Sequence, residues 1–316
     1  MRCYFSSAGK ITASRLVKLC VLLPGLLIHC AALPLAARMV KDQTGRRVNV
    51  PDNPQRLISL APSITETLYA LGVGDRIVGD SDYCDYPAAA LLKPHVGGTQ
   101  NPSLEKIVDL KPDLVLGIPE ANRRETADQL EKLGIPLYGL SAGSVDETLN
   151  SIKDLGNILG QGEQAKFLVD GLQRRVEDVR REAGNRTRPK VLFVVWFRPL
   201  ITAGHNTFIA DAIRIAGGVS ISDDLSGEWP RLSLEEALHR DPDIILFSKS
   251  ESFSPTLGEF QKLPGWKDFR AVKNHRMYFV SDTINRPSPR LIDALEEVAR
   301  ILHSPPPAAS GAELRR

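Results

Sequence analysis

Two stretches of the chain repeat one pattern, SLEKIVDLKPDLVLG at residues 103–117 and SLEEALHRDPDIILF at residues 233–247. In each copy a serine can cap a helix whose first turn carries a glutamate, where the helix dipole favours negative charge. A Pro-Asp pair then turns the chain into an apolar run that is typical of a buried strand. We interpret the two copies as one unit that is repeated in two homologous lobes.

Around both copies, short apolar runs alternate with helical patterns. We expect strands at residues 56–60, 76–79, 113–117, 137–140, 190–197, 243–248 and 276–281, and helices at 63–71, 208–216 and 289–302. Strands that alternate with helices in this way are typical of parallel sheets. The sequence therefore predicts an α/β fold of two similar lobes with parallel-rich sheets, an N-terminal lobe at residues 38–143 and a C-terminal lobe at residues 185–303.

The stretch between the lobes, residues 144–184, has a different pattern. Apolar residues recur at helical spacing from Ser144 to Leu159 and again from Glu163 to Glu182, and Ser144 with Glu147 can form a capping box. About 20 residues at a rise of 1.5 Å each give a helix of roughly 30 Å. We expect these bridging helices to join the lobes as a long rigid backbone that limits movement between them.

The N-terminus has the composition of an export signal. Residues 1–18 carry four basic residues and no acidic one, and an apolar run follows from Leu19 to Pro34. The run is too short and too interrupted for a membrane span, so it predicts a cleaved signal peptide at residues 1–37. The bulky His29 before Cys30 disfavours lipid attachment at that cysteine.

Charge, cysteine content and the C-terminus narrow the possibilities further. The chain of 316 residues has a formal net charge of +2, and loss of the signal's four basic residues leaves about −2, which gives no reason to expect nucleic-acid binding. Cys84 is the one cysteine that lies after the signal, so no intrachain disulfide is expected. The Pro- and Ala-rich tail at residues 304–316 is predicted to be disordered.

The motifs of common enzyme classes are absent from the sequence. There is no G-x-S-x-G elbow, Walker loop or H-E-x-x-H, and no two histidines stand three or four residues apart. We therefore expect no catalysis, no resident cofactor and no metal site. A periplasmic hydrolase, which would need a nucleophile–base pair such as Cys84 with His95, is an alternative from a different class.

Aromatic and charged residues follow several of the expected strands. In open α/β sheets, ligands bind beyond the carboxyl ends of the strands. If the two lobes face each other, these side chains line one cleft, and flat apolar faces with a few charges suit a large, partly planar, partly polar ligand. The candidate ligand-binding residues are Tyr83, Tyr86, Trp196, Arg198, Trp229, Asp282 and Arg286.

Four stretches resemble a known family, the periplasmic solute-binding proteins of ABC importers for metal chelates. They are SDYCDYP (81–87), NPSLEKIVDLKPDLVLG (101–117), EWPRLSLEEAL (228–238) and SDTINRPSPRL (281–291). Members of this family bind cobalamin, siderophores or haem between two lobes that a helical backbone joins. The similarity is greatest to the cobalamin-binding members, which implies a corrinoid ligand and a periplasmic location.

The resemblance also implies roles for single residues, because Tyr83, Trp229, Asp282 and Arg286 match positions that contact cobalamin in the family. Other positions depart from the enterobacterial cobalamin binders. These are Thr99 and Ile118, where those proteins have tryptophans, and Val195 and Ile201, where they have phenylalanines. Such a cleft is less aromatic, which keeps a ferric siderophore or haem as the alternative ligand.

The repeated glutamates gain an implied partner. Glu105 and Glu235 match the residues with which the family docks onto arginines of the membrane permease. The implied partners are thus an ABC importer permease with its ATPase, and the protein is expected to be a monomer. A ligand-sensing subunit, which would serve a receptor instead of a permease, is the alternative within the same fold.

Overall fold

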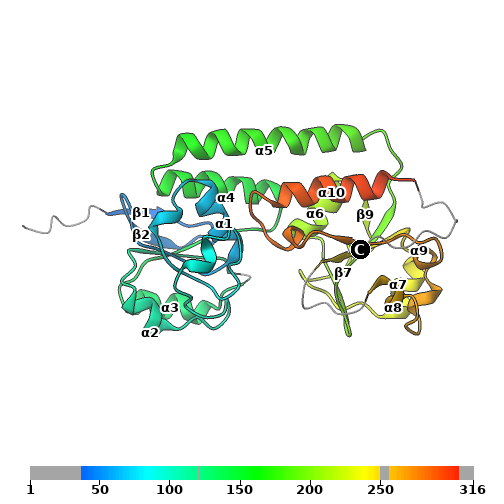
Figure 1. Cartoon of the computed structure of the whole chain (residues 1–316), viewed down its shortest axis with the longest axis horizontal. Coiled ribbons are helices and arrows are strands. Elements are labelled where there is room, and N and C mark those ends of the chain that lie inside the picture. Colours follow the sequence, from blue (N-terminus) through cyan, green and yellow to red (C-terminus); the bar gives the residue numbers. More distant parts are fainter. Residues whose placement is uncertain (1–36, 120, 250–255, 306–316) are drawn as a thin grey trace, which may run out of the picture. The chain divides into compact units, whose positions relative to one another are not determined.

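Two sheets, one in each lobe, form the framework of the computed structural model (Figure 1). The first sheet has the order β4-β3-β5-β6, and all its neighbouring strands are parallel. In the second sheet, β9, β7, β10 and β11 follow one another, again with parallel neighbours. Counted over the parallel strands of each sheet alone, without the antiparallel β8, both orders are 2-1-3-4, which confirms the prediction of two similar lobes with parallel-rich sheets. The strands are β3 (Leu57–Ser59), β4 (Ile77–Asp80), β5 (Leu114–Gly117), β6 (Leu137–Gly139), β7 (Lys190–Phe197), β9 (Val219–Ser220), β10 (Ile244–Ser248) and β11 (Met277–Val280).

The structure describes residues 37–119, 121–249 and 256–305, and Ala37 begins one compact unit. The predicted signal peptide lies outside the described residues except for Ala37, and the predicted disordered tail lies outside them from residue 306 onward. Within the described ranges, every helix is too short or too polar to span a membrane.

The repeated segments occupy the same place in the two lobes. α2 (Leu104–Asp109) leads into β5, and α7 (Leu234–Arg240) leads into β10. Ser103 accepts a hydrogen bond from a backbone N–H in the first turn of α2 at 3.3 Å, and Ser233 does the same for α7 at 3.0 Å. Both serines are therefore helix N-caps, as the sequence predicts.

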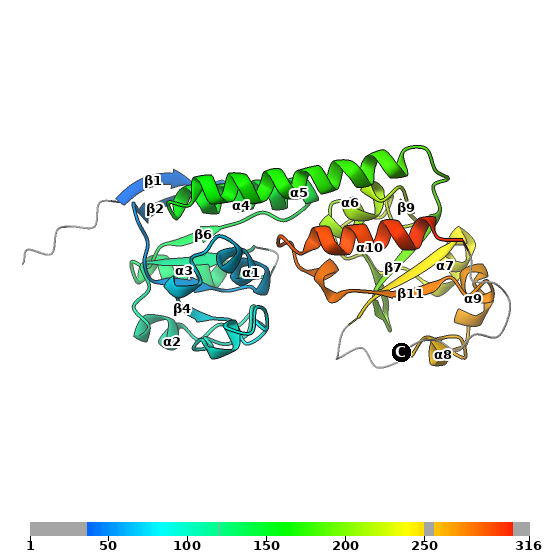
Figure 2. The same cartoon turned by 45° about the horizontal axis from the view of Figure 1, so that its top comes forward.

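Two helices, α4 (Val145–Ile158) and α5 (Gly162–Ala183), connect the lobes. The Ser144 hydroxyl accepts a hydrogen bond from the Glu147 N–H at 3.0 Å and caps α4. Leu172 and Val176 of α5 belong to a core that continues from one sheet to the other. Figure 2 shows α5 extending over elements of both lobes.

Helices cover both faces of each sheet. In the N-terminal lobe, α1 (Pro62–Ala70) packs on one face, and α2 and α3 (Arg124–Lys132) pack on the other. In the C-terminal lobe, α6 (Phe208–Ile215) and α10 (Leu291–His303) share one face. The opposite face is covered by α7, α8 (Leu257–Phe260) and α9 (Arg270–Lys273). This layering leaves the carboxyl ends of the strands free to form a site.

Several elements were not predicted from the sequence. They include α3, α8 and α9, the strand β8 (Leu200–Thr202), which pairs antiparallel with β7, the two-residue β9, and the hairpin of β1 (Ala37–Lys41) and β2 (Arg47–Pro51). Tertiary contacts fix the hairpin, because the Gln43 side chain donates to Asp154 at 2.7 Å and accepts from the Ser141 N–H at 2.6 Å. Such contacts leave no local signal in the sequence.

Candidate ligand-binding cleft

A cleft of about 1060 Å³ lies between the two lobes, and both contribute its walls. The segments after β3, β4 and β5 supply the N-terminal wall, and the segments after β10 and β11 supply much of the C-terminal wall. The cleft therefore lies beyond the carboxyl ends of the strands, where ligands bind in open α/β sheets.

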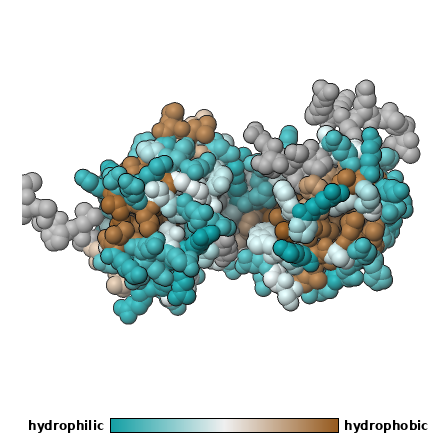
Figure 3. Space-filling view, turned by 90° about the horizontal axis from the view of Figure 1, so that it is seen from below, coloured by the Kyte–Doolittle hydropathy of each residue, from teal (hydrophilic) through white to brown (hydrophobic). Residues whose placement is uncertain are grey.

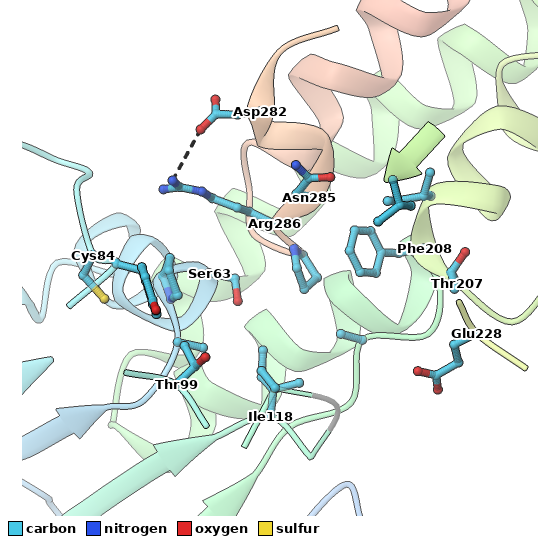
Figure 4. A pocket seen from close by; sticks show the side chains of 18 of the residues that line it. Ser63, Cys84, Thr99, Ile118, Thr207, Phe208, Glu228, Asp282, Asn285 and Arg286 are labelled. Atoms are coloured by element: carbon cyan, nitrogen blue, oxygen red, sulfur yellow. Dashed lines mark ion pairs between the residues drawn. The ribbon is translucent and has the colours of Figure 1, made fainter. Parts of the chain in front are cut away.

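Two helices begin at the cleft, one from each lobe. Pro62 opens α1 and lines the cleft with Ser63. The Thr207 hydroxyl accepts a hydrogen bond from the Ala210 N–H at 3.2 Å and caps α6, so Phe208 begins that helix at the cleft wall. Figure 4 shows Phe208 and Ile118 entering the hollow from different lobes. Helix N-termini carry partial positive charge and can attract ligand oxygens.

Four of the seven candidate ligand-binding residues line this cleft. Tyr83 and Trp229 come from different lobes, and their side chains are 61% and 42% exposed. Asp282 and Arg286 also belong to the lining, and Figure 4 shows them joined by an ion pair. The structure thus brings two exposed aromatic rings and two charged groups to one hollow, which is what a large ligand with flat and polar parts needs.

The other three candidates are not among the lining residues. The guanidinium of Arg290 lies over the ring of Tyr86, 3.9 Å from its centroid. Trp196 donates from Nε1 to the carbonyl oxygen of Arg198 at 2.8 Å. A ligand-binding role for Tyr86, Trp196 and Arg198 stays a prediction, and it would require the ligand to extend beyond the cleft.

Arg286 forms ion pairs with three carboxylates at the cleft. Its guanidinium pairs with Glu66 at 2.9 Å, with both carboxylate oxygens of Asp85, and with Asp282 at 3.3 Å. The hydrogen bonds from Arg286 lower the pKa of the Asp85 carboxyl below its ordinary value. Conversely, the hydrogen bonds to Asp85 raise the pKa of Arg286, so the guanidinium stays ionised.

Cys84 and His95 have separate partners and do not form the nucleophile–base pair that the hydrolase alternative named. The Cys84 sulfur lies 3.2 Å from the Thr65 hydroxyl and 3.3 Å from the Ser81 hydroxyl. Burial raises the pKa of the Cys84 thiol, so it is a poor nucleophile. The His95 Nδ1 atom lies 2.7 Å from a carboxylate oxygen of the buried Asp80. A nucleophile–base contact between Cys84 and His95 is absent from the described structure.

Part of the lining was not predicted from the sequence. Asn206, Thr207 and Phe208 reach the cleft because α6 starts after β8, a strand that no sequence pattern indicated. Phe208 and Ile118 resemble ordinary core residues in the sequence. Glu228 also lines the cleft, and its place next to the candidate Trp229 in the sequence was the one signal that could have indicated it.

Three of the four positions that differ from the enterobacterial cobalamin binders lie in the cleft wall. Thr99, Ile118 and Val195 line it, whereas Ile201 is not a lining residue. The described residues contain no group of three His, Cys, Asp or Glu side chains that could hold a metal ion.

Comparison with known proteins relates this geometry to one family. The family model described as "Periplasmic binding protein" matches residues 57–283. The vitamin B12-binding protein of Vibrio cholerae serotype O1 (strain ATCC 39541) is 30% identical over 254 residues, which cover 80% of this chain and 90% of that protein. The vitamin B12-binding protein of Yersinia pestis (strain Pestoides F) is 32% identical over 253 residues, 80% of this chain and 88% of that protein.

Solved structures extend the comparison. The crystal structure of the periplasmic vitamin B12 binding protein BtuF of Vibrio cholerae superposes with a TM-score of 0.71 at 30% identity and covers 80% of this chain and 98% of that chain. The periplasmic heme-binding protein RhuT from Roseiflexus sp. RS-1 superposes with a TM-score of 0.72 at 28% identity, with 79% and 98% covered. The chain therefore belongs to the periplasmic binding proteins, non-enzymatic components whose family members deliver ligands to ABC importers.

Proposed function

We propose that this protein captures a corrinoid such as cobalamin in the cleft between its lobes and hands it to an ABC importer of the cell envelope. The observation that carries the proposal is the make-up of the cleft, which combines a volume of about 1060 Å³ with exposed rings from both lobes and an excess of carboxylates. A corrinoid presents a large, flat apolar ring system with a rim of neutral amide groups. Rings can pack on its faces, and carboxylates can accept hydrogen bonds from its amides.

The charges of the lining favour a neutral ligand over an anionic one. The described lining contains four carboxylates and two cations. The carboxylates are Asp82, Asp85, Glu228 and Asp282, and the cations are Lys249 and Arg286. Arg286 is already paired with carboxylates, one of which, Glu66, is buried. An anionic ligand would therefore meet net repulsion at close range, whereas neutral amides would find acceptors.

The alternative ligand is haem or a ferric siderophore, and one observation favours it. The phenol of Tyr83 is exposed in the cleft and is of a kind that binds ferric iron. Cys84 is a weaker candidate, because its raised pKa keeps the thiol protonated. The two propionates of haem, however, would lie among the carboxylates of the lining.

A titration of the purified protein by calorimetry tests the proposal. We expect cyanocobalamin to bind with a dissociation constant at or below about 1 μM. Haem should bind at least about 100-fold more weakly, because its anionic propionates would meet the carboxylates of the lining. A ferric hydroxamate, which has no flat ring system to pack against Tyr83 and Trp229, should also bind more weakly. Tight binding of haem alone, with a shifted Soret band, would show that the ligand is haem and not a corrinoid. Transport of the bound ligand would separate a carrier from a ligand-sensing subunit.

For delivery, we propose that Glu105 and Glu235 contact the permease. Both side chains are exposed in the first turns of α2 and α7, and neither has an ion-pair partner among the described residues. Figure 1 draws α2 and α7 on the side of the lobes away from α5. Figure 3 views that side, which is largely hydrophilic with separate hydrophobic patches on each lobe. Such a surface suits docking through ion pairs, which set orientation and association rate.

A further inference from the structure

A buried carboxylate of the N-terminal lobe accepts hydrogen bonds from three side chains of the C-terminal lobe. Glu66, on α1, is 3% exposed. One of its oxygens accepts from Arg286 Nη1 at 2.9 Å and from Arg290 Nη1 at 3.1 Å, and the other accepts from the hydroxyl of the fully buried Ser288 at 2.6 Å. All three donors belong to the short connection between the 3₁₀ turn η5 (Asp282–Asn285) and α10.

The same connection also fixes the loop that carries Tyr83. Arg286 donates two hydrogen bonds to Asp85, one of them from Nη2 at 2.9 Å. Arg290 lies over the ring of Tyr86 at 3.9 Å. The segment from Tyr83 to Tyr86 is therefore attached to the opposite lobe at two of its four residues, and Tyr83 itself projects into the cleft.

The geometry of this network constrains the separation of the lobes. A buried carboxylate is tolerated only when its hydrogen bonds are satisfied, and paired guanidinium–carboxylate contacts are strongly directional. Because the acceptor and its three donors belong to different lobes, these bonds form together at only one spacing. A shift of about 1 Å would break several of them at once.

We propose that Glu66 is a positioning residue of the cleft, which fixes the Arg286 guanidinium and, through it, the loop of Tyr83 at the spacing that the ligand requires. The inference deepens the proposed function and rests on it for the identity of the ligand. Glu66 does not line the cleft, so it acts on the ligand through Arg286 and the loop. Glu66 also holds Arg290, the arginine of the other lobe that lies over the ring of Tyr86.

Hydrogen–deuterium exchange without ligand, followed by cobalamin dissociation kinetics, tests this role. In Glu66→Gln, which keeps the size of the side chain but loses its charge, amides at residues 81–92 and 282–290 should exchange about 10-fold faster. The dissociation rate of cobalamin should rise about 10-fold, with an association rate within about twofold of the wild type. Because exchange is measured without ligand, failure of the wild type to bind cobalamin would count against the proposed function alone.

Two control variants separate positioning from general loss of stability. Glu296→Gln removes an equally direct carboxylate–arginine pair, with Arg175 of α5 at 2.7 Å, away from the cleft. Leu172→Ala destabilises the core without touching the cleft wall. Both should leave the exchange of the two cleft segments and the dissociation rate near wild type. The proposal is overturned if Glu66→Gln changes neither readout, or if Leu172→Ala changes both equally.

A milder variant keeps the test decisive if Glu66→Gln does not fold. Arg290→Met removes one donor to Glu66, and its side chain is partly exposed in the wild type. We expect two- to fivefold faster exchange at residues 81–92, because the variant loses both this hydrogen bond and the packing of Arg290 over the Tyr86 ring. Unchanged exchange in this variant would also overturn the proposal.

Discussion

At the scale of single residues, the aspartate of each repeated Pro-Asp pair has a structural role, as the capping serine does. Asp113 accepts a hydrogen bond from the Arg56 N–H at 2.9 Å, and Asp243 accepts one from the Lys190 N–H at 2.8 Å. Each carboxylate thereby anchors the start of the strand that comes first in the parallel sheet of its lobe, β3 or β7. The residues two positions earlier, Lys111 and Asp241, both adopt left-handed backbone angles, with φ of 47° and 49°. The repeated Pro-Asp thus encodes one turn and one strand anchor, used twice.

Two tryptophans with matched exposure test which rings contact the ligand. Trp229, 42% exposed, lines the cleft, whereas Trp196, 43% exposed, does not. We expect Trp229→Ala to weaken cobalamin binding about 10- to 100-fold, since a stacked aromatic anchor contributes roughly 2 kcal/mol. Trp196→Ala should stay within about twofold of the wild type by calorimetry. An equal loss in both variants would show that the ligand reaches Trp196, as the sequence alone predicts.

Asp80 makes the stability of the folded protein depend on pH. Burial raises the pKa of the Asp80 carboxyl to about 6, although its hydrogen bond to His95 opposes the shift. The unfolded group titrates near pH 4, so between about pH 4 and 6 the folded state binds the proton more tightly, and this contribution declines as pH rises. Relative to Asp80→Asn, the wild-type free energy of unfolding should fall by up to about 3 kcal/mol from pH 4 to pH 7. Urea titrations of both proteins measure it, and a difference that stays constant with pH would refute the assignment.

At the scale of elements, α5 gains its stability from one buried face. Leu172 is 5% exposed within the continuous core, whereas Phe167 on the same helix is 75% exposed. Leu172→Ala should cost about 2–5 kcal/mol of unfolding free energy, because it leaves a cavity in the core under the helix. Phe167→Ala, a larger truncation, should change stability by less than about 0.5 kcal/mol. Denaturant unfolding of the two variants checks this, and similar losses would mean that α5 does not bury the face described.

Predictability from the sequence also differs between elements for physical reasons. The strand at 190–197 and the helix after Ser144 were predicted with nearly their observed ends, because an apolar run and a capping box are local signals. α3 was missed because its sequence RETADQLEK is mostly charged, and β9 because two residues carry no period. In the cleft, exposed rings such as Tyr83 could be predicted from their place after strands. Phe208 could not, because an apolar residue at a helix start has the pattern of core.

At the scale of the whole molecule, duplication explains how a cleft arises without a dedicated domain. Each lobe presents the carboxyl ends of its own parallel sheet, and the connecting helices hold these two edges on opposite sides of one hollow. The buried Glu66 and its partners then join the two lobes beside the hollow. The duplicated plan also places one glutamate-bearing helix, α2 or α7, on each lobe.

The paired placement of Glu105 and Glu235 makes a prediction that concerns transport and not binding. Reversing both charges, with Glu105→Arg and Glu235→Arg, should leave cobalamin affinity within about twofold, because neither residue lines the cleft. Uptake of labelled cobalamin by cells that rely on the variant should fall at least about 10-fold, since like charges would then meet at the permease. Glu125→Arg with Glu163→Arg is the matched control, because both are exposed carboxylates in first turns, of α3 and α5. Normal uptake with the first pair, or equal loss with the control pair, would show that docking uses another surface.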